Sequence, residues 1–185
     1  MPNYASYSEA RDALCSANRV LVIGCSGGGK TTLALALAKQ YSLEYQSIDR
    51  DVRWLPDWKV RDRDEQRQIL SELVARNRWI MDGSGASTFD IRVPRADLII
   101  WLRLPRVTSL LGVARRVLKN YGKVRIAMAD GCREPFPDRE FLSYIWNFER
   151  KSAPAFVSQI DRFGPTVPVV VCRSRKEATR LLTER

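Results

Sequence analysis

The spacing G-x-x-x-x-G-K-T, at residues 24–31, constrains this chain more than any other feature of its sequence. It directly follows the largely apolar run at 19–23 and directly precedes the helix-forming run at 32–38. A strand that leads through a glycine turn into a helix aims successive backbone N–H groups and a helix N-terminus at one anion. The segment therefore predicts nucleoside triphosphate binding by the loop residues Gly24, Ser26, Gly27, Gly28 and Gly29.

The residues that close this motif have separate tasks in phosphate binding. Lys30 is placed to reach the β and γ phosphates as a positive charge. The Thr31 hydroxyl is placed to complete the shell of a Mg²⁺ ion that keeps most of its waters. Thr32 stands one step into the helix, within reach of the α-phosphate. We therefore expect ATP and Mg²⁺ as ligands, and the motif does not separate ATP from GTP.

Hydrophobic patterning along the chain alternates between strands and helices, which favours an α/β fold with a parallel sheet and helices on both faces. The expected strands are residues 19–23, 43–48, 79–81, 98–103 and 167–172. The expected helices are residues 8–15, 30–41, 62–77, 107–120, 138–163 with a division at Pro154, and 176–183. Asp62 with Glu65 and Ser87 with Asp90 have the spacing of capping boxes. We expect residues 1–185 to form a single domain.

Composition limits the kinds of site and compartment. The sequence has no histidine, and its four cysteines form no C-x-x-C pair, which argues against a zinc site and for reduced thiols. Cys25 lies inside the phosphate loop, either as a small filler or as a thiolate that would repel the nucleotide. No apolar run approaches the roughly 18 residues that a bilayer requires, and no secretion signal is visible. We expect a cytoplasmic protein without a membrane partner.

The charge balance favours a polyanionic ligand. The chain carries 31 basic and 21 acidic residues, which gives a net charge of +10. No Asp or Glu occurs between Leu98 and Ala129, whereas this stretch contains Arg103, Arg106, Arg115, Arg116, Lys119, Lys123 and Arg125. Such a segment is typical of a phosphate clamp or of a nucleic-acid-binding patch.

Charged residues follow the predicted strands, at the sheet edge where open α/β sheets bind ligands. Asp82 is the acidic residue expected to orient Mg²⁺ beside the phosphate loop and to border the substrate. Asp49 or Asp51 would hold a metal-bound water or bind the acceptor and take its hydroxyl proton, since a chain without histidine needs a carboxylate base. For each of these three aspartates the alternative is a turn residue or a helix cap. Arg173, after the last strand, is an expected nucleotide contact.

Arginines complete the set of candidate catalytic and acceptor contacts. Arg115 and Arg116 lead into a glycine- and proline-containing segment, residues 121–137, that is either a mobile lid or an irregular insertion. Closure of such a lid would complete a positive clamp around the transferred phosphoryl group. Arg92 is expected to fix an anionic acceptor. For any single arginine the alternative is a solvated basic helix face.

These features, in this order, resemble the adenylate kinase group of nucleotide and shikimate-type kinases. The matching features are the phosphate loop, the acidic strand end at Asp49, the capped helix after it, Asp82-Gly83 after a strand, and the helix at 110–116. The resemblance implies a three-layer P-loop NTPase fold with a five-stranded parallel sheet in the order 2-3-1-4-5. It also implies an acceptor-binding region at about 50–78, a lid at about 115–137 carrying Arg115 and Arg116, phosphate binding by residues 24–32 and metal association of Asp82.

A narrower resemblance covers nearly the whole chain. The runs at 79–83, 101–105, 128–132 and 141–146 are similar to those of the bacterial DNA topology modulation proteins. That similarity implies an association with DNA, although the sequence has no helix-turn-helix or similar reading module.

Three functions follow from these observations. The leading hypothesis is a kinase that transfers the γ-phosphoryl group of ATP·Mg²⁺ to a nucleotide or other small molecule. The alternative is an ATP-dependent protein that contacts nucleic acid through its basic segment. A GTPase switch is the third, because residues 82–85 fit D-x-x-G, but the chain has no N-K-x-D to recognise guanine. The acceptor and the oligomeric state stay open.

Overall fold

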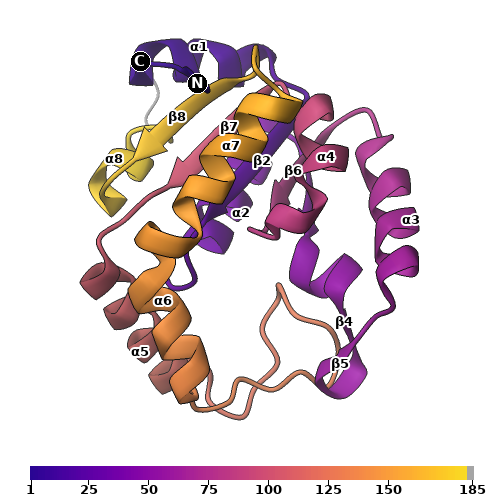
Figure 1. Cartoon of the computed structure of the whole chain (residues 1–185), viewed down its shortest axis with the longest axis vertical. Coiled ribbons are helices and arrows are strands. Elements are labelled where there is room, and N and C mark those ends of the chain that lie inside the picture. The colour runs from indigo at the N-terminus through magenta and orange to yellow at the C-terminus, as the bar shows by residue number, and fades with distance from the viewer. Residues whose placement is uncertain (183–185) are drawn as a thin grey trace.

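The structure is a computed structural model that describes residues 1–182, and its centre is a sheet of parallel strands (Figure 1). The sheet has 6 strands in the order β1-β8-β7-β2-β6-β3. Their bounds are Asn3–Tyr4 for β1, Arg19–Gly24 for β2, Glu44–Ser47 for β3, Trp79–Asp82 for β6, Leu98–Leu102 for β7 and Pro168–Cys172 for β8.

The predicted α/β class and the predicted strand order are confirmed, with one addition. Read from β3, the sheet runs β3, β6, β2, β7, β8, which is the expected order 2-3-1-4-5. The sixth strand, β1, pairs with the outer edge of β8 through Asn3 opposite Pro168 and Tyr4 opposite Val169. A strand of two exposed residues has no hydrophobic alternation, which is why the sequence pattern did not predict it.

Helices cover both faces of the sheet because neighbouring strand residues point to opposite sides. In β2, Val20 and Val22 belong to one apolar core with helices α1 (Tyr7–Ser16), α2 (Lys30–Tyr41) and α8 (Arg175–Thr179). Leu21 and Ile23 of the same strand belong to a second core with α3 (Arg63–Val74), α4 (Phe89–Arg92), α5 (Arg106–Asn120), α6 (Arg139–Lys151) and α7 (Ala153–Phe163). The result is a three-layer α/β/α arrangement.

Helix boundaries agree with the predictions except at a few ends. Pro154 divides the predicted 138–163 helix, since α6 ends at Lys151 and α7 has proline in its first turn. α3 ends at Val74 and not at residue 77. α8 ends at Thr179 and not at residue 183, which lies outside the described residues.

The two predicted capping boxes were wrong, although one cap residue was right. Asp62 caps α3 by accepting from the N–H groups of Asp64 and Glu65, but the Glu65 side chain pairs with Arg61. Ser87 lies in a 3₁₀ turn, Ala86–Thr88, and α4 begins after Thr88 without a side-chain cap. The two acidic residues expected to complete the boxes instead form ion pairs, Glu65 with Arg61 and Asp90 with Arg67.

Two irregular regions face each other beyond the carboxyl edge of the sheet. The first follows β3 and contains a π-helical turn (Ile48–Arg53), strand β4 (Trp54–Leu55), the 3₁₀ turn Pro56–Trp58 and strand β5 (Lys59–Val60). The second, here called the strap, is residues 121–137, which cross from α5 to β4 and β5 (Figure 1). α5 is helical through Asn120, so Arg115 and Arg116 lie on a regular helix, and only the strap part of the predicted 115–137 lid lacks helical structure.

Within residues 1–182, no helix combines the length and the apolar character needed to cross a bilayer.

Candidate active site

The phosphate loop joins β2 to α2 in the way that its sequence predicts. Gly27 and Gly29 adopt φ angles of 78° and 95°, which favour glycine, and α2 begins at Lys30. A Cβ on Gly27 would lie 2.1 Å from the Ser109 carbonyl oxygen, and one on Gly112 would lie 2.0 Å from the Gly27 carbonyl oxygen. The loop therefore packs directly against the backbone of α5, which brings the basic helix to its side.

Lys30 is oriented by the loop itself. Its Nζ donates a hydrogen bond to the Cys25 carbonyl oxygen at 3.1 Å. Burial raises the pKa of the Cys25 thiol to about 11, although the charge of Lys30 opposes this shift. The thiol is therefore neutral near pH 7, so Cys25 is a small filler and does not repel an anion.

Asp82 and Thr31 meet beside the loop because β6 neighbours β2. Val22 is in register with Asp82, and the Thr31 hydroxyl donates to the Asp82 carboxylate at 2.5 Å. Tyr45, from β3, donates to the same carboxylate oxygen at 3.3 Å. Burial raises the pKa of Asp82, while the charge of Lys30 and the bond from Thr31 oppose the increase. A buried carboxylate next to a hydroxyl is the kind of oxygen ligand set that Mg²⁺ takes.

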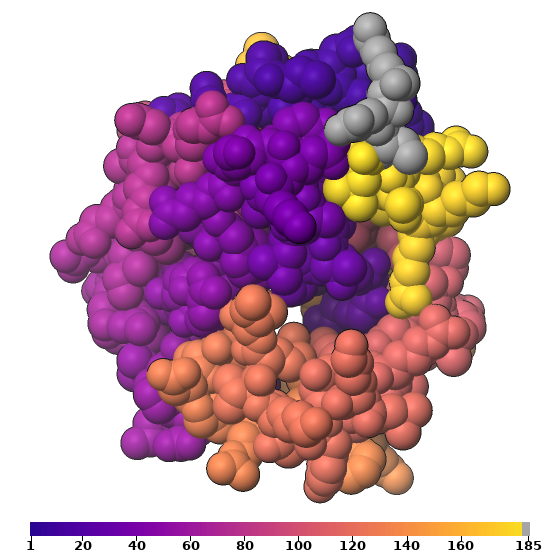
Figure 2. Space-filling view, turned by 180° about the vertical axis from the view of Figure 1, so that it is seen from behind, coloured from indigo at the N-terminus to yellow at the C-terminus, as the bar shows by residue number. Residues whose placement is uncertain are grey.

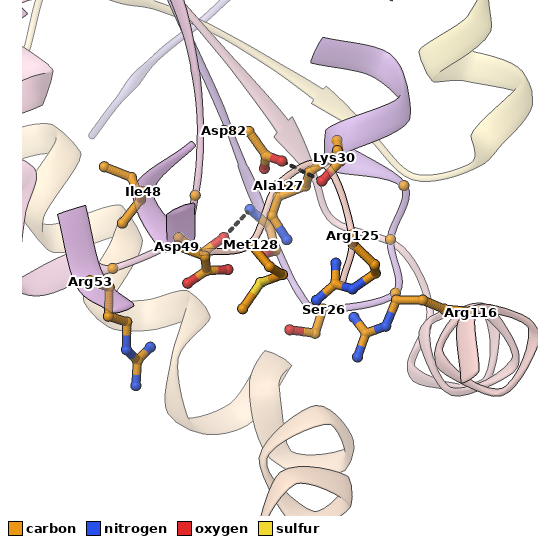
Figure 3. Close-up of a pocket in the computed structure, with 18 of the residues that line it drawn as sticks. Ser26, Lys30, Ile48, Asp49, Arg53, Asp82, Arg116, Arg125, Ala127 and Met128 are labelled. Carbon is orange, nitrogen blue, oxygen red and sulfur yellow. Dashed lines mark hydrogen bonds between the residues drawn. The ribbon is translucent and has the colours of Figure 1, made fainter. Parts of the chain in front are cut away.

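A cleft of about 2150 Å³ lies between the phosphate loop, the irregular region after β3 and the strap. From behind, Figure 2 shows a hollow between the salmon-to-orange atoms of α5 and the strap and the indigo-to-purple atoms above them, with the yellow C-terminal segment to one side. The predicted site residues that line it are Gly24, Ser26, Gly27, Gly28, Gly29, Lys30, Thr31, Thr32, Asp49, Asp82, Arg115 and Arg116. Figure 3 shows Lys30 and Asp82 on one side of this space and Asp49 on another.

Asp51 and Arg173 do not line this cleft. The Asp51 carboxylate accepts from the Ser47 N–H at 2.7 Å and pairs with Arg50 at 2.6 Å, so it stabilises the turn after β3. Arg173 lies between the end of β8 and the N-cap of α8, where its backbone N–H donates to the Glu177 carboxylate at 2.7 Å. The residue that reaches the loop from this region is Arg175, whose Nη2 donates to the Gly27 carbonyl oxygen at 3.2 Å.

Arg92 also lies away from the cleft, buried within α4. Its side chain is fully buried and donates to the carbonyl oxygens of Gly83 at 2.8 Å and Gly85 at 2.7 Å. Burial lowers the pKa of Arg92 to about 9, so the group stays protonated near pH 7. Arg92 thus fixes the loop after β6 and does not present its charge to an acceptor.

The strap is attached to the region after β3 by backbone and thiol contacts. The Ser47 hydroxyl donates to the Ala127 carbonyl at 3.0 Å, and the Trp58 N–H donates to Cys132 Sγ at 3.2 Å. Met128, Ala129 and Cys132 are buried against Trp54 and Trp58, whose rings meet edge to face with 5.3 Å between centroids. These tryptophans therefore pack the strap in place.

Glu134, which the sequence did not single out, joins the strap to α5. Its carboxylate is paired with Arg116 at 2.7 Å and with Arg125 at 2.5 Å, and its side chain is 1% exposed. All three residues line the cleft. Glu134 gave no sequence signal, because its pairing with Arg116 and Arg125 depends on how the strap folds back.

Several basic residues of the segment 98–129 have local partners. Arg103 pairs with Glu149 of α6, and the Arg106 guanidinium lies 3.8 Å from the Trp146 ring centroid. Together with the pairs of Arg116 and Arg125 to Glu134, these contacts direct much of the positive charge to α6 and the cleft.

Comparisons with known proteins give a fold likeness. No family model matches the sequence, and a search of curated proteins also gives no match. The structure is similar to shikimate kinase from Acinetobacter baumannii in complex with shikimate, with a TM-score of 0.60 and 16% identity over 93% of this chain and 92% of that one. It is also similar to shikimate kinase from Bacteroides thetaiotaomicron (TM-score 0.54, 16% identity, 90% and 94% coverage).

A third neighbour is deoxyadenosine kinase from M. mycoides with bound products, with a TM-score of 0.52 and 14% identity over 89% of this chain and 94% of that one. The chain therefore has the fold of P-loop kinases. The broader resemblance to the adenylate-kinase-like group agrees with these neighbours in fold, whereas the narrower one to DNA topology modulation proteins stays a prediction.

Proposed function

We propose that this protein is a kinase that transfers the γ-phosphoryl group of ATP·Mg²⁺ to a small-molecule acceptor held in the cleft. The main support for the proposal is that Lys30, Thr31 and Asp82 share one large cleft with charged residues of the region after β3, Asp49 and Arg53. A protein that only hydrolyses ATP has no need for a cleft that extends so far beyond the phosphate loop. The fold likeness to kinases acting on small molecules supports the same conclusion.

The triphosphate of ATP would bind at the phosphate loop. The loop N–H groups and the N-terminus of α2 would bind the phosphate oxygens, and Lys30 would neutralise charge on the transferring group. Thr31 and Asp82 fit Mg²⁺, because their hydroxyl and carboxylate oxygens are adjacent and the carboxylate is buried beside the phosphate loop. When bound, Mg²⁺ would supply further neutralisation of the phosphate charge.

The acceptor end is bordered by Asp49 and by the basic side chain of Arg53 (Figure 3). In a chain without histidine, Asp49 is the carboxylate best placed to bind an acceptor hydroxyl and receive its proton. The Arg53 guanidinium carbon lies 4.8 Å from the centroid of the Trp54 ring, and this contact holds the positive charge at the edge of the cleft. We therefore expect an acceptor that carries a hydroxyl and an anionic group.

Phosphoryl transfer also requires that water be kept from the reacting groups. The strap covers the space between the phosphate loop and the region after β3, with Ala127 and Met128 over its middle (Figure 3). Arg116 and Arg125 border the same space and would place positive charge near the transferred group. The strap thus performs the closing task expected of a lid.

The test is incubation of the purified protein with ATP or GTP, Mg²⁺ and a panel of nucleosides, nucleotides and small hydroxy acids. We expect a phosphorylated product with one class of acceptor and turnover that saturates with that acceptor. Nucleotide hydrolysis alone across the panel would contradict the proposal. Added DNA tests the alternative of a nucleic-acid-associated protein, which requires turnover that responds to DNA and binding that weakens steeply with salt.

A further inference from the structure

Glu134 is a buried acidic group shared by two basic residues from different elements. Arg116 comes from α5 and Arg125 from the strap, and each donates its Nε–H to one oxygen of the same carboxylate. The Glu134 side chain is 1% exposed, so its carboxylate is shielded from water, and both bonds are charge-assisted.

The backbone of Glu134 is placed independently of its carboxylate. Its N–H donates to the Lys123 carbonyl at 2.9 Å, and its carbonyl accepts from the Gly122 N–H at 3.0 Å. These main-chain bonds join the two ends of the strap to each other. The carboxylate of Glu134 takes no part in these bonds and contacts the two arginines instead.

The two guanidinium groups need a shared counter-charge in order to lie together. Burial lowers the pKa of Arg116, and the nearby charge of Arg125 lowers it further, whereas Glu134 opposes both effects. Figure 3 shows Arg116 and Arg125 side by side next to Ser26 of the phosphate loop. Without the carboxylate, mutual repulsion would move at least one of them away.

We propose that Glu134 is a positioning residue that holds Arg116 and Arg125 over the phosphate loop, where they bind the terminal phosphate of a nucleoside triphosphate. The inference rests on the proposed function and adds a residue that does not itself touch the substrate. Two arginines and one carboxylate leave a net positive charge at this point, which favours the extra anionic group of ATP over ADP.

The experiment measures nucleotide affinity by calorimetry, so it does not depend on knowing the acceptor. For Glu134→Gln we expect ATP·Mg²⁺ affinity to fall about tenfold, the value of one charge-assisted hydrogen bond, and ADP·Mg²⁺ affinity by less than about twofold. Glu72→Gln, the same change at an exposed site on α3, is the matched control and leaves both affinities unchanged. If Glu134→Gln does not fold, Glu134→Asp takes its place, with a smaller loss of ATP affinity expected.

A second arm separates positioning from a general structural role. In an Arg116→Ala/Arg125→Ala background, Glu134→Gln should cause no further loss of preference for ATP over ADP, since the carboxylate acts only through the arginines. Unchanged affinities in Glu134→Gln, or equal losses for ATP and ADP, would overturn the inference. A wild-type protein that binds ATP but phosphorylates no acceptor would instead contradict the proposed function and leave this result intact.

Discussion

The two sides of the cleft are built in different ways. The phosphate side consists of β2, the loop and α2, and its backbone is set by bonds between residues close in sequence or on neighbouring strands, although α5 and Arg175 also contact the loop. The acceptor side consists of short strands, a π-helical turn and the strap, and its contacts join residues far apart, such as Ser47 to Ala127 and Trp58 to Cys132.

The two halves therefore hold their backbones in place by different kinds of contact. In the phosphate half, the sheet ladder and the helix N-terminus hold the backbone, so substitutions there change chemistry or packing directly. In the acceptor half, side chain to backbone contacts hold the strap, so substitutions should open a part of the molecule without unfolding the whole. Local opening of this kind is typical of regions that must admit a substrate.

The largest effect is expected in the phosphate half, from Lys30→Ala. Removing the charge that faces the transferred group should lower kcat by about 10² to 10³ or more, the cost of losing one preorganised contact to the developing charge. Thermal unfolding should change little, because Lys30 bonds to a single carbonyl. Lys39→Ala, on the exposed far end of α2, is the control. Turnover that survives Lys30→Ala would place the chemistry outside the phosphate loop.

The second effect tests how tightly the phosphate loop packs against α5. Helix propensity alone predicts that Gly112→Ala stabilises the protein by about 1 kcal/mol. The added Cβ would lie 2.0 Å from the Gly27 carbonyl, so we expect a loss of about 1–3 kcal/mol in unfolding free energy instead. Denaturant titration measures the sign of the change in unfolding free energy. Ala114→Gly, on the exposed face of α5, measures the effect of helix propensity alone and is the control. A stabilised Gly112→Ala variant would mean that the loop and α5 separate easily.

The difference between local and long-range contacts also explains which residues could be predicted from the sequence. The phosphate half was predictable because a local motif and strand periodicity dictate it, and the register of β2 with β6 then brings Asp82 to Thr31. Asp51, Arg92 and Arg173 were assigned from their places in the chain, but Asp51 pairs with Arg50, Arg92 is buried against backbone carbonyls, and Arg173 does not line the cleft. Arg175 and Glu134 gave no signal, since their roles depend on long-range folding of the chain.

A smaller effect is expected in the acceptor half, from Cys132→Ala. The change removes the acceptor of the Trp58 N–H and should cost about 1–2 kcal/mol locally. Hydrogen exchange at the Trp58 amide should then speed up about tenfold or more, whereas the Trp79 amide in β6 changes less. Cys15→Ala, at an exposed site, is the control. Equal acceleration at both amides would show that the two halves open as one unit.

The smallest effect is expected from removing the charge of Asp82. It is a gain of stability, whereas the other substitutions lower turnover or stability. Burial raises the native pKa of Asp82, so below the unfolded-state pKa of about 3.9 the carboxyl is protonated in both states and carries no penalty. As the pH rises through the native pKa, ionisation must occur in a buried position and stability is lost. Asp82→Asn removes this titration and should therefore raise Tm at pH 7.5, with the gain disappearing toward pH 3.

Measuring Tm with and without ATP·Mg²⁺ then connects this penalty to function. In a chain of this size, 1 kcal/mol corresponds to about 2–4 °C, so the ligand-free difference is measurable by calorimetry. Added ATP·Mg²⁺ should raise Tm less in Asp82→Asn than in the wild type, because the amide replaces the carboxylate paired with Thr31. An Asn variant that is less stable at pH 7.5 and responds fully to ATP·Mg²⁺ would make Asp82 a structural residue. In that case the buried charge of Asp82 in the phosphate half would not be a cost that the protein bears for ligand binding.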